Sequence, residues 1–256
     1  MPAHVRTALP RPLETIVDTA RRGGIPDAAT AARLLTGSSV TPDDLAPWAA
    51  FDHPAADGYG RRPVVVTDTF ELMVMSWNPG DFSAIHDHGH TQWGAVKVFG
   101  VAEHATFEIR GGTLRTTERL LTGIGQVQPV DHDLIHQMGN PGRERFLSLH
   151  LYGLVPQTAS SGGGVTGDAR IFDLLNNQIV TTNGGVFHNL DDEHVTSRRT
   201  GLPADIAAVR EHHHQMLDQL TRVRLAEPTT ASKTDLIVHR LQNELHRLDS
   251  APELAA

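Results

Sequence analysis

The chain has 256 residues and a formal net charge of −8, with 39% hydrophobic and 20% charged residues. This composition is typical of one folded core with room for an appendage, and it excludes wholesale disorder, a membrane span and a basic nucleic-acid interface. Because the chain has no cysteine, disulfides, thiolate metal sites and a cysteine nucleophile are also excluded.

The first residues carry no apolar run of signal-peptide length. We therefore expect a cytoplasmic protein with no nucleic-acid partner and no membrane partner. Histidine occurs 16 times, and with no cysteine present it becomes the expected ligand of any bound metal.

The first segment of the chain has a helical pattern. The runs PLETIVDTARRGG and PDAATAARLLTG each begin near a proline and end at glycine, as helices commonly do. A third short helix is expected after Thr41, whose hydroxyl suits an N-cap. We predict that residues 1–58 form an N-terminal helical segment that packs on the rest of the molecule.

A β-rich barrel is predicted over residues 59–192. Turn signals such as Asn140-Pro141-Gly142 separate short runs of β-branched and aromatic residues, and no βαβ alternation is present. The stretch TASSGGGVTG (158–167) is typical of a flexible loop. The predicted strand runs are PVVVTD, FELMVMSW, QWGAVKVFG, EHATFEIR, RERFLSLHLYG and VFHNL.

After residue 200 the helical pattern returns. ADIAAVREHHHQMLDQLTRVRL and TDLIVHRLQNELHRLDS carry apolar residues at steps of three and four, and Glu227-Pro228 separates them. We predict a helical pair over residues 200–250, either antiparallel on the barrel or as the contact of a homodimer. In the run His212-His213-His214 we expect a solvated patch whose middle residue lies at the helix seam.

The stretch RFLSLHLYG (145–153) alternates leucine with Ser148, His150 and Tyr152. In a strand, the leucines therefore face one side and the polar residues face the other. If the polar side faces an enclosed site inside a small barrel, the leucines pack outside it, against a second layer or the helices.

SAIHDHGHTQWG holds the densest group of candidate metal ligands. His86 and His88 share one face of an extended chain, and two imidazoles so spaced can bind one ion at about 2.1 Å. His90 follows a glycine at which the strand can bend, so we prefer the first two. For a third ligand from a distant strand, His136 is better placed than His132, because an apolar pair precedes it and a turn follows it.

With these motifs in view, the chain resembles the cysteine dioxygenase type I family of thiol dioxygenases, which are cupins. The resemblance covers about residues 57–190, and the helical tail after 200 lies outside it. It implies a mainly β fold, a cupin small β-barrel (jelly-roll) with N-terminal helices and a C-terminal helical extension. The motifs that carry it, in order, are YGR (59–61), MSWNPG (75–80), IHDHG (85–89), LIHQMGN (134–140), SLHLY (148–152) and RIFDLLNNQIVTT.

The resemblance implies that His86, His88 and His136 bind one Fe(II) ion, with O2 as co-substrate. The implied reaction adds both oxygen atoms to the sulfur of a small thiol and gives a sulfinate. Three neutral imidazoles would leave the ion its full +2 charge, so an anionic thiolate is a favoured additional ligand.

It further implies a hydrogen-bonded relay through Ser148 and His150 that ends at Tyr152, a phenol beside the iron. Tyr152 would donate a hydrogen bond to the substrate or to oxygen. Arg61 would hold a substrate carboxylate in its planar fork and so fix the sulfur over the metal.

Two tryptophans are further candidates for substrate contact. Trp93 stands where animal members of the family carry a cysteine that crosslinks to the active-site tyrosine, and here no such crosslink can form. If Trp93 lines the pocket, it could exclude cysteine-like poses or offer a π face to a cationic group. For both Trp93 and Trp77, packing in the core is the competing interpretation.

The identity of the thiol stays open among cysteine or a close relative, 3-mercaptopropionate and ergothioneine. Family members that act on 3-mercaptopropionate share the tryptophan after the histidine pair but typically carry glutamine where Arg61 stands. Two other classes compete. A different cupin enzyme is disfavoured by the relay and by the absence of a carboxylate ligand, and a non-catalytic metal- or ligand-binding cupin would not need the tyrosine.

Overall fold

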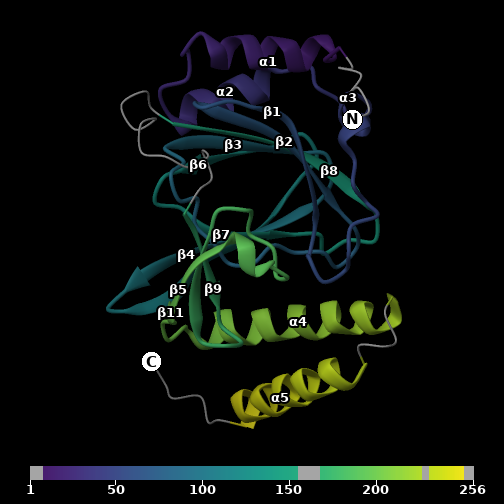
Figure 1. Ribbon diagram of the computed structural model, residues 1–256, viewed down its shortest axis with the longest axis vertical. Coiled ribbons are helices and arrows are strands. Elements are labelled where there is room, and N and C mark those ends of the chain that lie inside the picture. The colour runs from purple at the N-terminus through teal and green to yellow at the C-terminus, as the bar shows by residue number, and fades with distance from the viewer. Residues whose placement is uncertain (1–7, 155–167, 227–230, 251–256) are drawn as a thin grey trace.

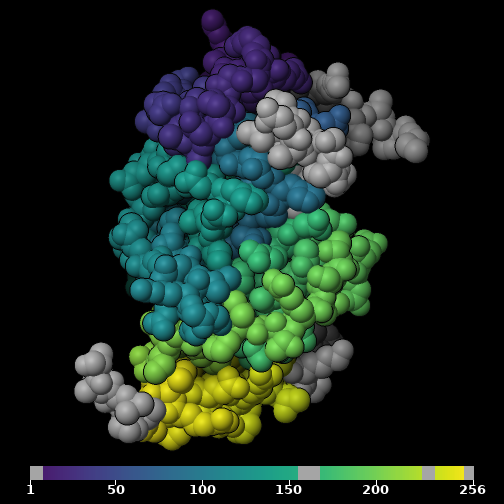
Figure 2. Space-filling model, turned by 90° about the vertical axis from the view of Figure 1, so that its left-hand side faces the viewer, coloured from purple at the N-terminus to yellow at the C-terminus, as the bar shows by residue number. Residues whose placement is uncertain are grey.

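The structure, a computed structural model, describes residues 8–154, 168–226 and 231–250. Its elements stack in layers along the long axis: N-terminal helices, a five-stranded sheet, a second sheet and two C-terminal helices (Figure 1). The space-filling view from the side shows the same succession, from the purple N-terminal helices to the yellow C-terminal helix (Figure 2). The small antiparallel β-barrel between terminal helices, predicted from the sequence, is therefore confirmed.

The helices are α1 (Arg11–Arg21), α2 (Ala28–Gly37), α3 (Pro42–Leu45), α4 (Ile206–Ala226) and α5 (Ala231–Ser250). The strands are β1 (Gly60–Val66), β2 (Phe70–Trp77), β3 (Trp93–Val98), β4 (Ala102–Arg110), β5 (Thr113–Thr122), β6 (Val127–Asp131), β7 (Ile135–Gly139), β8 (Phe146–Gly153), β9 (Ala169–Asp173), β10 (Gln178–Thr182) and β11 (Val195–Thr200).

The first sheet has the strand order β1-β2-β8-β3-β6, which places β8 at its centre. Because successive residues of a strand point to opposite faces, β8 turns Leu147, Leu149 and Leu151 outward and its polar residues inward. The three leucines belong to one buried cluster with the N-terminal helices, as the alternation predicts.

The second sheet consists of the strand groups β5-β4-β7 and β9-β10-β11. An extended segment, residues 82–87, joins the two groups. On one side it is bridged to β7 by the pairs Phe82–Gly139 and His86–His136, and on the other side His86 pairs with Ile171 of β9. The segment that carries the first histidine motif is thus built into the barrel wall.

The N-terminal helices cover the outer face of the first sheet (Figure 1). Leu13, Ile16 and Leu35 are fully buried against it, and burying a side chain of this size contributes about 1.5–3 kcal/mol. Lys97 of β3 donates from Nζ to the Leu35 carbonyl (3.1 Å) and the Ser38 carbonyl (2.9 Å), so its charge lies against carbonyls at the end of α2.

The C-terminal helices cover the second sheet, and α5 packs on α4 in the antiparallel sense. Arg210 near the start of α4 pairs with Asp249 near the end of α5 (3.3 Å), and Arg224 pairs with Asp235 at the opposite ends (2.9 Å). The structure shows the pair lying on the barrel, and a homodimer contact through these helices stays a prediction.

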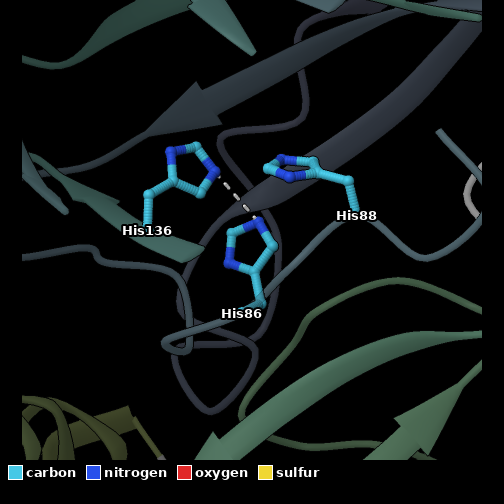
Figure 3. Close-up of side chains that lie close together, drawn as sticks. All are labelled: His86, His88 and His136. Carbon is cyan, nitrogen blue, oxygen red and sulfur yellow. Dashed lines mark hydrogen bonds between the residues drawn. The ribbon is translucent and has the colours of Figure 1, made fainter. Parts of the chain in front are cut away.

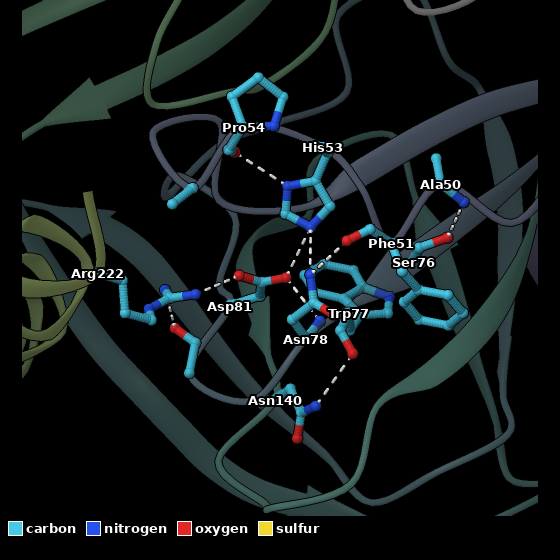
Figure 4. Close-up of polar contacts among 12 residues, drawn as sticks. Ala50, Phe51, His53, Pro54, Ser76, Trp77, Asn78, Asp81, Asn140 and Arg222 are labelled. Carbon is cyan, nitrogen blue, oxygen red and sulfur yellow. Dashed lines mark hydrogen bonds and ion pairs between the residues drawn. The ribbon is translucent and has the colours of Figure 1, made fainter. Parts of the chain in front are cut away.

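A buried carboxylate ties α4 to the barrel and to the N-terminal segment (Figure 4). Asp81 accepts hydrogen bonds from His53 Nε2 (2.9 Å), the Asn78 amide (2.6 Å) and Arg222 Nη1 (2.6 Å). Burial by itself lowers the pKa of His53, but the hydrogen bonds to Asp81 and the Pro54 carbonyl and the nearby carboxylate charges together outweigh this, so the pKa is raised. A buried carboxylate is tolerated here because it is fully paired.

Three expectations from the sequence need correction. The barrel sheet extends past the predicted end at residue 192, because β11 pairs with β10. The run 186–190, expected as a strand, is a loop. His212 is not solvated but 4% exposed, because α4 turns it toward the second sheet. The loop expected at 158–167 and the break at Glu227-Pro228 lie outside the described residues.

None of the helices in the described ranges combines the length and the apolar character needed to cross a bilayer.

The buried His212 is expected to make the folded state less stable at low pH. It lines a cavity of about 260 Å³ between β9, β10 and α4, its Nδ1 has no hydrogen-bond partner, and burial lowers its pKa to about 3. The unfolded chain, in which histidine has a pKa near 6.5, binds the proton more readily, so stability is lost as the pH falls below about 6.5. Between pH 7 and pH 5 this one residue lowers the free energy of unfolding by about 2 kcal/mol.

We expect the free energy of unfolding of His212→Gln to fall less than that of the wild type between these pH values, by about that amount, as measured by urea unfolding at both. Identical losses in the two proteins would contradict this.

Candidate metal centre

His86 and His136 are held opposite each other by their own backbones. The His86 amide donates to the His136 carbonyl and the His136 amide donates to the His86 carbonyl, both at 2.9 Å. In an antiparallel pair of this kind, the two side chains leave the same face of the sheet. The bridge therefore brings together two residues that are 50 positions apart in the sequence.

The imidazoles of His86, His88 and His136 converge in the barrel interior (Figure 3). One ring nitrogen from each lies within 4.8 Å of the others, and the Nε2 atoms of His86 and His136 are 3.2 Å apart. Ligands bound at about 2.1 Å to a shared ion lie roughly 3.0–3.4 Å from one another, so the spacing suits a metal site.

The outward nitrogens of two of these rings have partners of their own. His86 Nδ1 lies 2.8 Å from the Ala84 carbonyl, which requires it to donate and leaves Nε2 with a lone pair. His136 Nδ1 lies 2.7 Å from His104 Nε2. Both ring nitrogens of His88 are buried without a hydrogen-bond partner, although the Leu134 carbonyl lies nearby. Such an orphaned polar ring is costly, and a metal ion would satisfy it.

Burial keeps all three rings neutral. It lowers the pKa of His86 to about 4 and lowers the pKa values of His88 and His136 well below the usual range, with the neighbouring imidazoles adding to the effect. Only a neutral imidazole can offer a lone pair to a metal, so the residues fit a divalent transition metal held by three uncharged nitrogen donors.

His104 on β4 is a residue that sequence reasoning missed. It is buried, its pKa is lowered to about 4 by burial, and it faces His136 Nδ1. As a neutral acceptor it would fix the His136 tautomer that leaves Nε2 free for a metal. The signal in the sequence was one histidine in EHATFEIR, which carries no metal-ligand spacing.

The predicted hydrogen-bond chain Ser148–His150–Tyr152 is present, and it has a further member, Trp77, which contacts Ser148. Trp77 Nε1 donates to Ser148 Oγ (2.8 Å), Ser148 Oγ lies 2.7 Å from His150 Nε2, and His150 Nδ1 lies 2.9 Å from the Tyr152 hydroxyl. Burial lowers the pKa of His150 to about 3 and raises that of Tyr152, so both are neutral.

Trp77 fixes the direction of one bond, because an indole nitrogen can only donate. Ser148 accepts from Trp77 and keeps a second lone pair, so the remaining bonds can run in either direction. In the direction that serves a ligand, Ser148 gives its own proton to His150 Nε2. His150 then carries its proton on Nδ1 and donates it to the Tyr152 oxygen. The Tyr152 hydrogen is left free to point at a ligand in the barrel.

A glycine makes room for Tyr152. Gly94 pairs with Tyr152 across β3 and β8, and a Cβ at that position would lie 2.4 Å from the tyrosine ring. The neighbouring Trp93 points to the opposite face, where it packs in the outer cluster with the N-terminal helices.

A small cavity of about 30 Å³ lies against the imidazoles of His86 and His88. This is room for about two or three water-sized groups. Arg61 and Tyr152 line it, as does Tyr59, whose buried hydroxyl has no partner and whose pKa is raised to about 12 by burial. Arg61 is half-buried and donates from Nε to Met73 Sδ (3.0 Å).

Not every sequence candidate reaches this cavity. Trp93 and Trp77 are not among the residues that line it, so neither is placed to touch a ligand there. Trp77 instead stacks on Tyr59 (5.2 Å between ring centroids) and supports the relay. His90 pairs with Asp168 outside the triad, and His132 is exposed.

Substitutions in and around the triad should weaken metal binding to different degrees. We expect His86→Ala or His136→Ala to abolish binding of Fe(II) or of Co(II) as a spectroscopic substitute, because two imidazoles remain where three are needed. His104→Ala should weaken affinity by about 10–100-fold through the lost support of His136. His132→Ala is the matched control and should bind like the wild type. Full occupancy in His136→Ala, measured by anaerobic titration, would contradict the ligand assignment.

Comparisons with known proteins agree with this geometry. The family model "Cysteine dioxygenase type I" matches residues 7–158, which is more than half of the chain. Among solved structures, the chain is similar to a double-stranded β-helix protein from Klebsiella pneumoniae (20% identity, 50% of this chain and 90% of that chain, TM-score 0.35). It is also similar to the Cnp3 cupin domain of Schizosaccharomyces pombe (11% identity, 39% and 63%, TM-score 0.33). At such scores the structural likenesses carry no argument of their own. The family match does: this chain belongs to the cysteine dioxygenase type I family.

Proposed function

We propose that the protein is an Fe(II)-dependent thiol dioxygenase that adds both atoms of O2 to the sulfur of a small carboxylate-bearing thiol, cysteine or a close relative, and releases a sulfinate. The family points to dioxygenase chemistry in general, and the site narrows the proposal to a thiol. The observation that carries it is the buried imidazole triad, two of whose rings, those of His86 and His88, line one cavity with a tyrosine and an arginine.

Three neutral imidazoles would hold the iron and leave its charge uncompensated. When bound, Fe(II) would supply a site for the substrate thiolate and for O2, so that oxygen reaches sulfur and the thiolate RS⁻ becomes RSO2⁻. The protein contributes burial, which keeps water away, and a donor set without a carboxylate, which favours an anionic sulfur ligand.

Tyr152 is the proposed hydrogen-bond donor of the site. In the proposed arrangement His150 donates to its oxygen and leaves the hydroxyl hydrogen free, and burial keeps the phenol protonated by raising its pKa. A preorganised donor of this kind stabilises charge that develops on the reacting group. Ser148 and Trp77 act through His150 and hold the tautomer that this requires.

Arg61 and Tyr59 are proposed to position the substrate. Both line the cavity, and each presents donors that suit a carboxylate: a guanidinium fork and a buried hydroxyl without a partner. With the carboxylate held at this end and the sulfur near the triad, a short thiol spans the cavity.

The first test is O2 uptake by the iron-loaded protein across a panel of thiols, with sulfinate identified as the product. We expect thiol-dependent uptake, and we expect Tyr152→Phe to lower kcat/KM by about 10²-fold while iron occupancy is unchanged, because only the free hydroxyl is removed. A non-catalytic metal-binding cupin would give no uptake with any thiol. Wild-type kinetics in Tyr152→Phe would remove the tyrosine from the mechanism.

Arg61→Ala tests the carboxylate contact. We expect KM for carboxylate thiols to rise at least about tenfold and KM for cysteamine, which has no carboxylate, to change far less, since a hydrogen bond to a charged group contributes about 1.5–3 kcal/mol. Arg62→Ala, on the same strand but pointing outward, is the control. Equal effects on both kinds of thiol would take Arg61 out of the substrate site.

A further inference from the structure

The cavity between β9, β10 and α4 is separate from the one beside the triad. Its volume is about 260 Å³, against about 30 Å³ beside the triad, and among the described residues none lines both cavities. A cavity of about 150 Å³ can hold a benzene ring, so this one has room for a one-ring compound with substituents. The thiol chemistry proposed above makes no use of it.

Two histidines line this larger cavity, and in each of them a buried ring nitrogen meets no hydrogen-bond partner within the described part of the chain. These atoms are Nε2 of His188, in the loop that follows β10, and Nδ1 of His212 on α4. The two side chains are near enough for a charge on His188 to lower the pKa of His212. A buried nitrogen without a hydrogen bond is costly, so a ligand that supplies one would bind favourably.

The His188 ring is held in place by its surroundings. Its backbone amide donates to the Asp57 carbonyl (3.2 Å), and its ring lies edge-on to Phe82, with 4.6 Å between the ring centroids. On another side, a Cβ at Gly58 would lie only 2.8 Å from the ring. A ring that is already fixed loses little freedom when it binds a ligand.

Apolar side chains from four parts of the fold form much of the remaining wall. Ile171 comes from β9, Val180 from β10, Phe187 from the loop and Met216 from α4. A ligand that fills the cavity therefore needs an apolar body as well as a polar group that reaches the histidines.

The two charged side chains of the lining, Asp173 and Arg198, have opposite signs and already have partners. Asp173 accepts from the Asn176 amide (2.9 Å) and from Asn176 Nδ2 (2.8 Å), and Arg198 pairs with Asp192 (3.0 Å). An ionised ligand would gain no unpaired counter-charge from these residues, and burying its charge would be costly. The lining therefore favours an uncharged ligand.

We propose that this cavity is a second binding site, which takes a small uncharged aromatic compound that carries a hydroxyl group. The ring lies among Val180, Phe187 and Met216, where ring–ring and sulfur–ring contacts are favourable. The hydroxyl reaches the unpaired histidine nitrogens. Because a hydroxyl both donates and accepts, it can bond to a neutral imidazole nitrogen in either tautomer. The site depends neither on a metal ion nor on thiol oxidation.

The test is a fluorine-19 NMR titration of the full chain, without added metal, with 4-fluorophenol. The matched probe 4-fluorotoluene has a methyl group in place of the hydroxyl and is otherwise the same. We expect saturable binding of 4-fluorophenol with a Kd of about 1 mM or lower, and binding of 4-fluorotoluene at least about tenfold weaker, because it leaves the nitrogens unpaired. The cavity beside the triad is too small for either ring.

Substitutions in α4 locate the binding site. Met216→Trp fills the cavity and should abolish binding, and Val180→Phe fills it from the side of β10 if the first variant does not fold. His212→Leu removes one unpaired nitrogen and should weaken binding of 4-fluorophenol at least about tenfold. His214→Leu, at an exposed position of the same helix, is the control and should bind like the wild type.

Three results would each overturn the proposal. Absence of saturable binding would mean that the cavity takes only water. Wild-type affinity in the cavity-filling variant would place the probe elsewhere on the molecule. Equal affinity for the two probes would remove the hydroxyl and the histidines from recognition.

Discussion

The candidate metal centre depends on one backbone pairing, that of His86 with His136. Their reciprocal hydrogen bonds fix the separation of two imidazoles without help from side-chain packing. The same segment, residues 82–87, is bridged on its other side to Ile171, so it completes the second sheet between β7 and β9. Closing the barrel and assembling the triad are therefore one structural event, and a change that opens this part of the wall would disperse the ligands.

The barrel interior combines neutral rings with compensated charges. Burial lowers the pKa values of His86 and His150 and raises that of Tyr152, so each of these groups is uncharged near neutral pH. Arg61 is paired with Glu71. In such surroundings a divalent ion would be the largest uncompensated charge. In the proposed function an anionic sulfur reduces that charge by binding to the ion.

The sequence predicted the parts of this site that follow from local spacing. The pair His86 and His88 came from a two-residue repeat, and the alternation in RFLSLHLYG placed the leucines outside and the relay inside. The sequence alone did not assign roles to His104 or Glu71, because their partners lie on strands whose register it does not show. FELMVMSW did contain a signal, namely one carboxylate within a strand buried on both faces. Trp93 was ambiguous because a strand's inner and outer faces differ by a single residue, and Gly94 decides the matter by lying against Tyr152.

The two faces of the first sheet have different roles, which explains why helices pack against the barrel. The barrel interior is shared by the relay, the candidate metal site and an apolar cluster that includes Met73, Met75 and Val96. The outer face of the sheet adds a second apolar cluster: Leu72 and Val74 of β2 alternate with Glu71 and lie in the cluster with α1 and α2. On the opposite side, Asp81 joins α4 to the barrel and to His53 through a fully paired buried charge. The layers outside the barrel thus add apolar burial to that of the interior cluster, so part of the inner face can carry polar relay residues and imidazoles.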